Sequence, residues 1–82
     1  MKSYSVSYAY STPDAARFGI VSKRMMSLDE IDFVFKSVSV DKCRSWISVV
    51  KSLRRGSSAE IRIAEKSETG EIFMKGWIVR KV

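Results

Sequence analysis

The residues best suited to binding a ligand lie in the stretch 41–56, DKCRSWISVVKSLRRG. If this stretch is a helix, residues at i, i+4, i+7 and i+11 form one face that is basic or small. These residues are Arg44, Ser48, Lys51 and Arg55. The one acid of the stretch is Asp41 at its start, so the cations lack the acidic partners of a salt-bridged helix and are free to contact phosphates.

The neighbours of this basic face support the same interpretation. Lys42 and Arg54 lie beside it in the sequence and add positive charge. The serines of the stretch are small enough to let a nucleic-acid backbone approach, and they can donate hydrogen bonds to phosphate. The alternative is a solvated face on which Arg54 and Arg55 only stabilise the negative end of the helix dipole.

A second candidate site lies on the last two strands, where aromatic and basic residues alternate. Phe73 and Trp77 flank Lys75 on one strand. Arg62 and Lys66 lie across from them on the other. Stacking on an aromatic ring is worth roughly 1–3 kcal/mol per base, so this pattern is typical of a surface that binds RNA or single strands. The alternative is that both aromatic rings belong to the core or to a dimer interface.

An aromatic stripe near the N-terminus allows two interpretations as well. Tyr4, Tyr8 and Tyr10 alternate with small residues. Such a stripe most often packs beneath a helix, here against Trp46 and Phe35, whereas a role in binding requires the rings to be exposed.

Several kinds of chemistry have no candidate residues. The chain has no histidine, the commonest general base, and a single cysteine, so the usual ligands of zinc are missing. Among the acids Asp29, Glu30 and Asp32, the first two are explained as first-turn residues of a helix. The glycines form neither a dinucleotide-binding fingerprint nor a phosphate-binding loop. We therefore expect neither an enzyme nor a bound cofactor or metal.

The helix that positions the basic face also has an apolar face. The residues with the spacing of that second stripe are Cys43, Trp46, Ile47, Val50 and Leu53. Asp41 is the candidate N-terminal cap, and Gly56 is the candidate left-handed residue that ends the helix.

Two strands and a short helix are expected before it. Residues 3–10 alternate between large and small side chains, which predicts a half-buried strand. Residues 11–14 have turn chemistry, and a second strand should run from about Ala16 to Met25, with Gly19 marking a bulge or a close approach.

The next segment has a helix signal and a competing strand signal. Ser27 and Glu30 have the spacing of a capping box, which predicts a short helix from about Leu28 to Lys36. The alternative is a strand over 31–40, because IDFVFKSVSV is rich in β-branched and aromatic residues.

The chain ends in a predicted hairpin. AEIRIAEK and EIFMKGWIVRKV flank the turn SETG, in which Gly70 suits a positive φ. Pairing Lys66 with Glu71 makes one face apolar and places the aromatic and basic residues on the other. A bulge at Gly76 would invert the face on which Trp77 lies.

The totals indicate a small basic globular protein. Its 82 residues support one domain over 1–82, with 45% hydrophobic and 29% charged residues. The net charge is +6, and residues 41–82 contribute +5 of it through ten bases and five acids. Such a field attracts nucleic acid first, an acidic protein second and an anionic membrane third. The alternative is that the charge serves solubility alone.

Cysteine usage and the N-terminus predict a location. One cysteine cannot form an internal disulfide, which favours a reducing compartment and a cytoplasmic protein. The start MKSYSVSYAY has no apolar signal region, and no stretch approaches the roughly 18 apolar residues of a membrane span. We therefore expect neither secretion nor membrane insertion.

In general character the chain resembles the small single-domain proteins that phages make early in infection to block host defences. This group includes anti-CRISPR proteins and RNA-binding antagonists of toxin–antitoxin systems. The resemblance rests on the strand start MKSYSVSYAY, the hairpin–helix–hairpin order and the absence of catalytic residues. It covers the whole chain without a specific motif, so it carries over no functional residue; it implies a counter-defence factor acting in the host cytoplasm.

Together these patterns predict an α+β domain in which two antiparallel hairpins, in the order ββααββ, form a sheet packed on one face by one long and one short helix. We expect it to bind RNA, or less readily DNA, through phosphates with low sequence specificity. The expected contacts are Arg44, Lys51, Arg54, Arg55, Arg62 and Lys75 for phosphates, and Phe73 and Trp77 for bases. The alternative is an inhibitor that docks on an acidic or nucleic-acid-binding surface of a host complex, and free strand edges are compatible with a homodimer.

Overall fold

The computed structural model describes residues 2–11 and 19–82, which form four strands and two helices. In chain order these are β1 (Tyr4–Ser11), β2 (Gly19–Met26), α1 (Leu28–Val38), α2 (Val40–Lys51), β3 (Ser58–Lys66) and β4 (Ile72–Lys81). All neighbouring strands are antiparallel, and their order across the sheet is β2-β1-β4-β3. The α+β class and the ββααββ order predicted from the sequence are confirmed.

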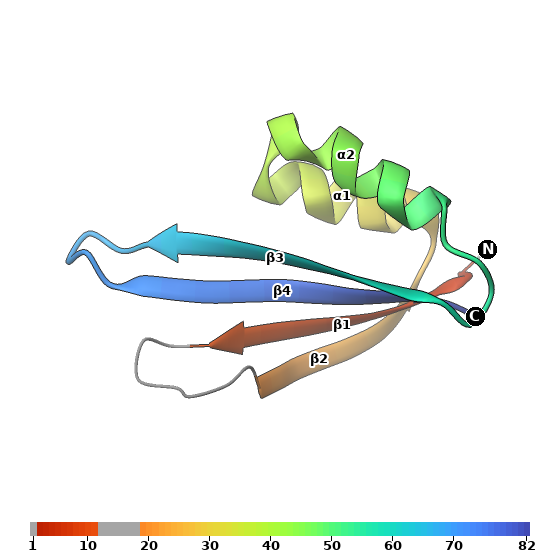
Figure 1. The fold of residues 1–82 in the computed structure, drawn as a ribbon, viewed down its shortest axis with the longest axis horizontal. Coiled ribbons are helices and arrows are strands. Elements are labelled where there is room, and N and C mark those ends of the chain that lie inside the picture. Colours follow the sequence, from red (N-terminus) through yellow and green to blue (C-terminus); the bar gives the residue numbers. More distant parts are fainter. Residues whose placement is uncertain (1, 12–18) are drawn as a thin grey trace.

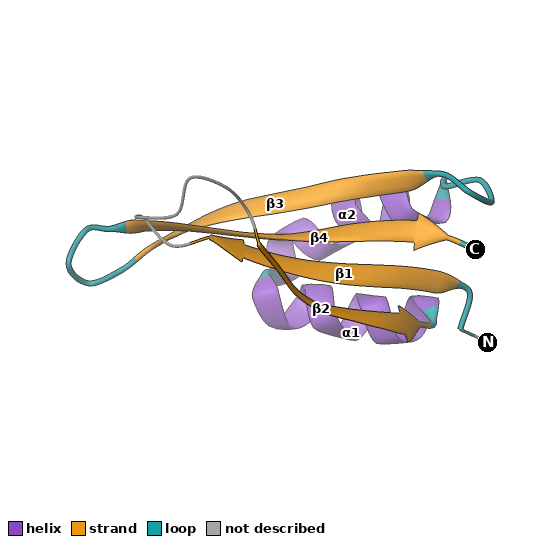
Figure 2. Cartoon of the chain, turned by 90° about the horizontal axis from the view of Figure 1, so that it is seen from below, coloured by secondary structure: helices purple, strands orange, loops and turns teal. Residues whose placement is uncertain are grey.

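Both helices lie on one face of the sheet (Figures 1 and 2). We call this the inner face, and the opposite side, over which no described element lies, the outer face. The helices cover the part of the sheet near the chain termini, while the β3–β4 hairpin projects beyond them (Figure 1). The core therefore occupies only part of the inner face.

The core is built from the predicted apolar face of α2, from α1 and from the inner face. Cys43, Ile47 and Val50 of α2 are buried, which confirms the stripe read from their spacing. Phe35 of α1 is fully buried, and its ring meets that of Trp46 edge-on at a centroid distance of 5.4 Å. A small protein can form a stable core in this way because aromatic side chains each bury a large apolar area.

The aromatic stripe of β1 faces inward, but the ring contacts of Tyr8 and Tyr10 are with β4 rather than with the predicted Trp46 and Phe35. Tyr4 is buried in the core. Tyr8 lies 5.5 Å from Trp77 between ring centroids, and Tyr10 stacks on Phe73 at 6.1 Å. The tyrosines thus hold β1 against β4.

The second strand is described over Gly19–Met26 and so extends one residue past the predicted Met25. Its predicted start at Ala16 and most of the turn expected at 11–14 lie outside the described residues. Gly19 pairs regularly with Tyr10, but the β1–β2 register shifts between Tyr8 and Ala9. A bulge at Gly19 is therefore wrong, because the irregularity lies further along the ladder, and the alternative of a close approach at Gly19 stays a prediction.

The capping box of α1 is present, and the competing strand over 31–40 is wrong. The Ser27 hydroxyl accepts a hydrogen bond from the Glu30 amide at 3.2 Å, and the Glu30 carboxylate accepts one from the Ser27 amide at 3.2 Å. The helix extends past the predicted Lys36 to Val38. Satisfying the free amides at its start favours helix over the β propensity of the segment.

Both ends of α2 differ from the prediction. Ser39, rather than Asp41, is the N-terminal cap, with its hydroxyl accepting from the Lys42 amide at 3.2 Å. The helix ends at Lys51, and Gly56 with φ +86° belongs to a turn closed by the Ser57 amide bonding the Arg54 carbonyl at 2.9 Å. Arg54 and Arg55 therefore lie outside the helix.

The predicted register of the last hairpin is wrong by one residue. Lys66 pairs with Ile72 rather than Glu71, because the loop has three residues, 68–70, and not four. The Ser67 amide donates to the Glu71 carbonyl at 2.8 Å, and Gly70 has φ +87°, as in a three-residue hairpin loop. A slip of one residue transfers every side chain of a strand to the other face.

This register divides the second candidate site. Phe73, Lys75 and Trp77 lie on the inner face, whereas Arg62 and Lys66 lie on the outer face. Strand pairing is continuous through Gly76, so the hairpin register, and not a bulge, places Trp77 on the inner face.

Candidate nucleic-acid interface

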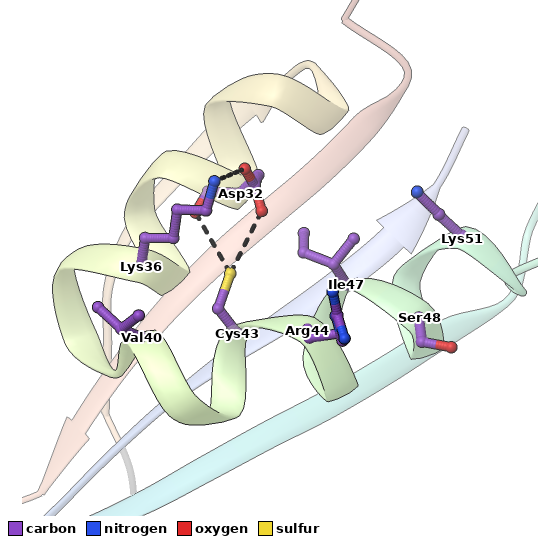
Figure 3. Close-up of a pocket in the computed structure, with 8 residues that line it drawn as sticks. All are labelled: Asp32, Lys36, Val40, Cys43, Arg44, Ile47, Ser48 and Lys51. Carbon is purple, nitrogen blue, oxygen red and sulfur yellow. Dashed lines mark hydrogen bonds and ion pairs between the residues drawn. The ribbon is translucent and has the colours of Figure 1, made fainter.

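A groove of about 480 Å³ runs between the two helices, on the side that faces away from the sheet (Figure 3). Its lining residues are Asp32, Lys36, Val40, Cys43, Arg44, Ile47, Ser48 and Lys51. The lining residues that come from α2 recur at helical spacing, so the groove follows the length of that helix. Three cations and one carboxylate line it, which gives it a positive balance.

The carboxylate of the groove is already occupied. The Asp32 carboxylate forms an ion pair with the ammonium of Lys36, one helical turn away, at a distance of 3.0 Å. The Cys43 thiol donates to the same carboxylate at 3.2 Å and lies 3.6 Å from the Asp32 carbonyl oxygen (Figure 3). These contacts tie α1 to α2 across the groove floor.

The electrostatics of this cluster follow from these contacts. The hydrogen bond from Lys36, and next that from Cys43, lower the pKa of Asp32 below its ordinary value. The same bond with Asp32 raises the pKa of Lys36. Burial raises the pKa of the Cys43 thiol, so the group stays protonated and is no nucleophile at neutral pH.

Five exposed cations lie along α2 and the turn after it, namely Lys42, Arg44, Lys51, Arg54 and Arg55, and we call the last four the basic surface. Arg44 and Lys51 line the groove two turns apart on α2. None of the four forms an ion pair with an acid that the structure describes. This confirms the sequence-based expectation that the cations of the stretch lack acidic partners.

The turn that carries two of these cations is anchored to the end of the sheet. The Gly56 amide donates to the Lys81 carbonyl at 2.7 Å, and the Lys81 amide donates to the Ser57 carbonyl at 3.0 Å. Arg80 pairs with Ser58 in the adjoining ladder. Arg54 and Arg55 therefore lie beside a further basic segment, at the end of the molecule where both chain termini lie (Figure 1).

The remaining predicted contacts are less available to a ligand. Arg62 pairs with Glu60, and the Lys75 ammonium lies 2.6 Å from the Glu65 carboxylate. Trp77 is only 6% exposed, because its ring packs on Phe35 and Tyr8 in the core. It cannot stack on a base, so the core alternative is the correct one for this residue.

Phe73 differs from Trp77 in being partly exposed. It lies near the start of β4, where the sheet extends beyond the helices, and its ring is stacked on Tyr10 at an interplanar angle of 20°. The structure thus does not bring Phe73 and Trp77 together with Arg62 in one site.

Lys36 is a groove residue that the sequence-based set lacks. Its i, i+4 spacing from Asp32 on a predicted helix was the available signal. The sequence could not show that this pair faces α2.

Other kinds of site have no support in the described part of the chain. Within residues 2–11 and 19–82, no group of three or more Cys, Asp or Glu side chains is placed to hold a metal ion. No helix among these residues is long and apolar enough to cross a membrane.

Comparison with protein-family models, curated proteins and solved structures finds no match to this chain.

Proposed function

We propose that this protein binds RNA through the basic surface, by phosphate contacts and with low sequence specificity. The observation that carries the proposal is the contrast among the six cations predicted to contact phosphates. Arg44, Lys51, Arg54 and Arg55 are exposed and have no ion-pair partner among the described acids, whereas Arg62 and Lys75 are paired with glutamates. When unpaired cations contact phosphates, the counterions condensed on the nucleic acid are released, and this release drives binding.

The low specificity follows from what the surface lacks. Base readout needs groove contacts or aromatic rings on which unstacked bases can lie. Trp77 is buried and Phe73 is stacked on Tyr10, so the rings expected to contact bases are engaged within the fold. Phosphate contacts position a nucleic acid but carry no sequence information.

RNA is favoured over duplex DNA by the way α2 packs. A helix that reads duplex DNA must project far enough to enter the major groove. Here α2 lies side by side with α1 over the sheet (Figure 1), and Arg44 and Lys51 line the groove between the two helices. A flexible single strand can follow such a shallow surface, as in other proteins that bind single strands through a positively charged groove.

The test compares two double charge reversals with equal change in net charge. In Lys51→Glu/Arg55→Glu the basic surface loses its charge, and in Lys23→Glu/Lys66→Glu exposed cations of β2 and β3 are reversed instead. Fluorescence anisotropy with a labelled single-stranded RNA should show binding nearly abolished in the first variant and much less weakened in the second. Equal losses in both variants, or no binding by the wild type, would refute the proposal.

A second candidate function is favoured by the apolar groups beside the charge. Val40 is 76% exposed and lines the groove together with Lys36 and Arg44. An exposed apolar side chain among cations suits an acidic protein partner. The protein would then be an inhibitor that docks on an acidic or nucleic-acid-binding surface of a host complex.

Purification with and without nuclease separates the two functions. Nucleic acid that co-purifies and disappears after nuclease treatment supports RNA binding. A stoichiometric protein partner that survives nuclease supports docking. A role as a phage counter-defence factor, suggested by the general resemblance, is compatible with either mode of binding.

A further inference from the structure

The strand β2 is an edge of the sheet. It stands at one end of the order β2-β1-β4-β3, and among residues 2–11 and 19–82 it pairs with β1 alone. This pairing is regular over residues 22–26, up to the register shift between Tyr8 and Ala9. An edge strand presents main-chain N–H and C=O groups with which another extended segment can pair.

The main-chain groups of β2 that face this edge follow from the ladders of β1. The Val82 amide donates to the Ser3 carbonyl at 3.0 Å, so the odd-numbered residues of β1 bond to β4. The even-numbered residues of β1 therefore bond to β2, where they are paired with the even-numbered residues of 22–26. The N–H and C=O groups of Lys23 and Met25 then point away from the sheet.

A cleft of about 440 Å³ lies beside this edge, between β2 and α1, and we call it the α1–β2 cleft. Its lining residues are Arg24, Met26, Asp29, Glu30, Phe33 and Val34. A smaller hollow of about 130 Å³ shares Arg24, Met26 and Val34 with it and is also lined by Tyr8 and Trp77 of the inner face. In Figure 2, α1 lies over the side of the sheet formed by β1 and β2. The cleft shares no lining residue with the groove between the helices.

The cleft has apolar walls that a partner side chain can cover. Phe33 is 75% exposed, although it lies two residues from the fully buried Phe35. Met26 is buried and Val34 is partly buried, so together they form an apolar floor beside the exposed ring. Covering such a ring removes apolar surface from water, which favours binding.

The charges around the cleft are arranged in order along the chain. Asp29 and Glu30 follow Met26, in the first turn of α1, whereas Lys23 and Arg24 precede it. An acidic group of a partner is therefore favoured opposite the two cations and disfavoured beside the start of α1.

The two cations of β2 are available to such a group. Neither Lys23 nor Arg24 forms an ion pair with an acid in the described part of the chain. Glu30 has other partners, since its carboxylate accepts from the Ser27 amide at 3.2 Å and lies 3.8 Å from the Lys2 ammonium. The hydrogen bond from Ser27 is the main cause that lowers the pKa of Glu30, and Arg24 contributes least to it.

We propose that β2 binds an extended segment of a partner protein, which adds antiparallel to the edge and carries two apolar residues followed by two acidic ones. The first apolar residue lies opposite Met26 and places its side chain in the α1–β2 cleft. The second lies opposite Met25, which is 44% exposed on the outer face. The two acids lie opposite Arg24 and Lys23, one on each face of the sheet.

The geometry of the ladder supports this order of residues. Arg24 and Met26 lie on the inner face, since they pair with Val6 and Tyr4. In the proposed ladder the pair at Arg24 is a non-hydrogen-bonded one, in which side chains approach each other most closely. A glutamate there is within reach of the guanidinium, and opposite charges across strands stabilise pairing.

A second copy of this chain does not fit the same edge. A two-fold axis at Lys23 or at Arg24 places that cation directly opposite itself, which is destabilising. An axis at Met25 pairs Lys23 with Ser27, which lies beyond the end of β2 at the start of α1. The edge therefore favours a partner strand of different, acidic sequence.

The first test uses a short fluorescein-labelled peptide in which leucine, valine and two glutamates follow one another between threonines. Fluorescence anisotropy with nuclease-treated protein should show saturable binding. A peptide of equal composition in the order leucine, glutamate, valine, glutamate places glutamate opposite Met25 and valine opposite Arg24. It should bind about tenfold more weakly or worse. Equal binding of the two peptides, or no binding of the first, overturns the proposal.

The second test separates this site from the basic surface. Arg24→Glu should weaken binding of the first peptide about tenfold or more, and replacing the first glutamate of the peptide by lysine should restore it. Lys51→Glu/Arg55→Glu, in the basic surface, should bind the peptide as the wild type does. A loss in that variant equal to the loss in Arg24→Glu would mean that the peptide binds the basic surface, and it would overturn the proposal without bearing on RNA.

The third test examines the strand pairing and leaves the protein unchanged. The valine amide of the peptide donates to the Met25 carbonyl in the proposed ladder, whereas the amide of the first glutamate points away from β2. Methylation of the valine amide should therefore weaken binding about tenfold or more, and methylation of the glutamate amide, the matched control, much less. Equal effects of the two methylations would overturn the pairing with β2.

Discussion

Gly76 occupies a position in β4 that has no room for a side chain. A Cβ atom there would lie 2.9 Å from the Ile61 carbonyl oxygen and 3.3 Å from Cγ of Arg62. The carbonyl belongs to the backbone of the adjacent strand and cannot move without disturbing the ladder that sets the inner face. This close approach explains a glycine in the middle of a central strand.

We therefore expect Gly76→Ala to lower the free energy of unfolding by roughly 1–3 kcal/mol, as for other overpacked positions. Urea denaturation followed by circular dichroism measures the change. Ala64→Ser, at an exposed position of β3, is the control and should stay within about 0.5 kcal/mol of the wild type. Equal stability of Gly76→Ala and the wild type would contradict this account of the strand.

The stability of the fold should depend on pH through Asp32, whose carboxylate bonds Lys36 of α1 and Cys43 of α2. Its pKa is lowered from its ordinary value of 3.8 by the hydrogen bond from Lys36 and then by that from Cys43. A carboxyl whose pKa is lower in the folded state stabilises the fold above its unfolded pKa. That stabilisation is lost as the pH falls through the lowered folded pKa.

Asp32→Asn should accordingly lower the Tm at neutral pH, with a deficit that shrinks as the pH falls below about 3.8. Thermal unfolding of both proteins across a series of pH values measures the effect. A deficit that is the same at neutral and acidic pH would show that the charge of Asp32 is not what holds the helices together.

At the scale of elements, α1 shows how local chemistry outweighs intrinsic propensity. Its segment is rich in β-branched and aromatic residues, yet it is helical because Ser27 and Glu30 satisfy the amides at its start. Ile31 and Phe35, at i and i+4, then both face the core. The cap and the spacing were visible in the sequence, so this helix was predictable.

Removal of the cap should weaken the element measurably. We expect Ser27→Ala to lower the free energy of unfolding by about 1 kcal/mol. Ser37→Ala, on the same helix but exposed and bonded only to the Val34 carbonyl, should change it by less than about 0.5 kcal/mol. Chemical denaturation of both variants provides the comparison, and similar losses in the two would argue against the capping box.

The register of the β3–β4 hairpin was not predictable, for a physical reason. Both faces of β4 carry apolar residues, since Ile72, Met74 and Ile78 alternate with Phe73, Trp77 and Val79. Hydrophobic alternation therefore could not decide which set faces the helices. The loop length decides it, and the turn SETG is compatible with a loop of three or four residues.

The end of α2 was misplaced for a related reason. A glycine after two arginines has the pattern of a helix stop, but the chain leaves the helix at Lys51 to reach β3. The positive φ of Gly56 serves the turn that joins α2 to the sheet instead. Tertiary connections of this kind are not encoded in the local sequence pattern.

At the scale of the whole molecule, positive charge is concentrated over α2 and the turn after it. The sequence predicted this set of cations because the stretch has almost no acids. It could not predict that Lys75 would be paired with Glu65 or that Trp77 would be buried, because both depend on the register of distant strands. The candidate site thus contains fewer residues than the sequence implied, and those that remain lie on α2 and the turn after it.

The measurement that tests this account most directly is the affinity for a single-stranded RNA as a function of salt concentration. If the four cations of the basic surface each neutralise one phosphate, the logarithm of the association constant should fall with the logarithm of salt with a slope of about −3. Lys51→Glu/Arg55→Glu should bind too weakly to give a slope, while Lys23→Glu/Lys66→Glu should keep a slope close to that of the wild type. RNA binding that is absent, or that does not change with salt, would contradict the central claim.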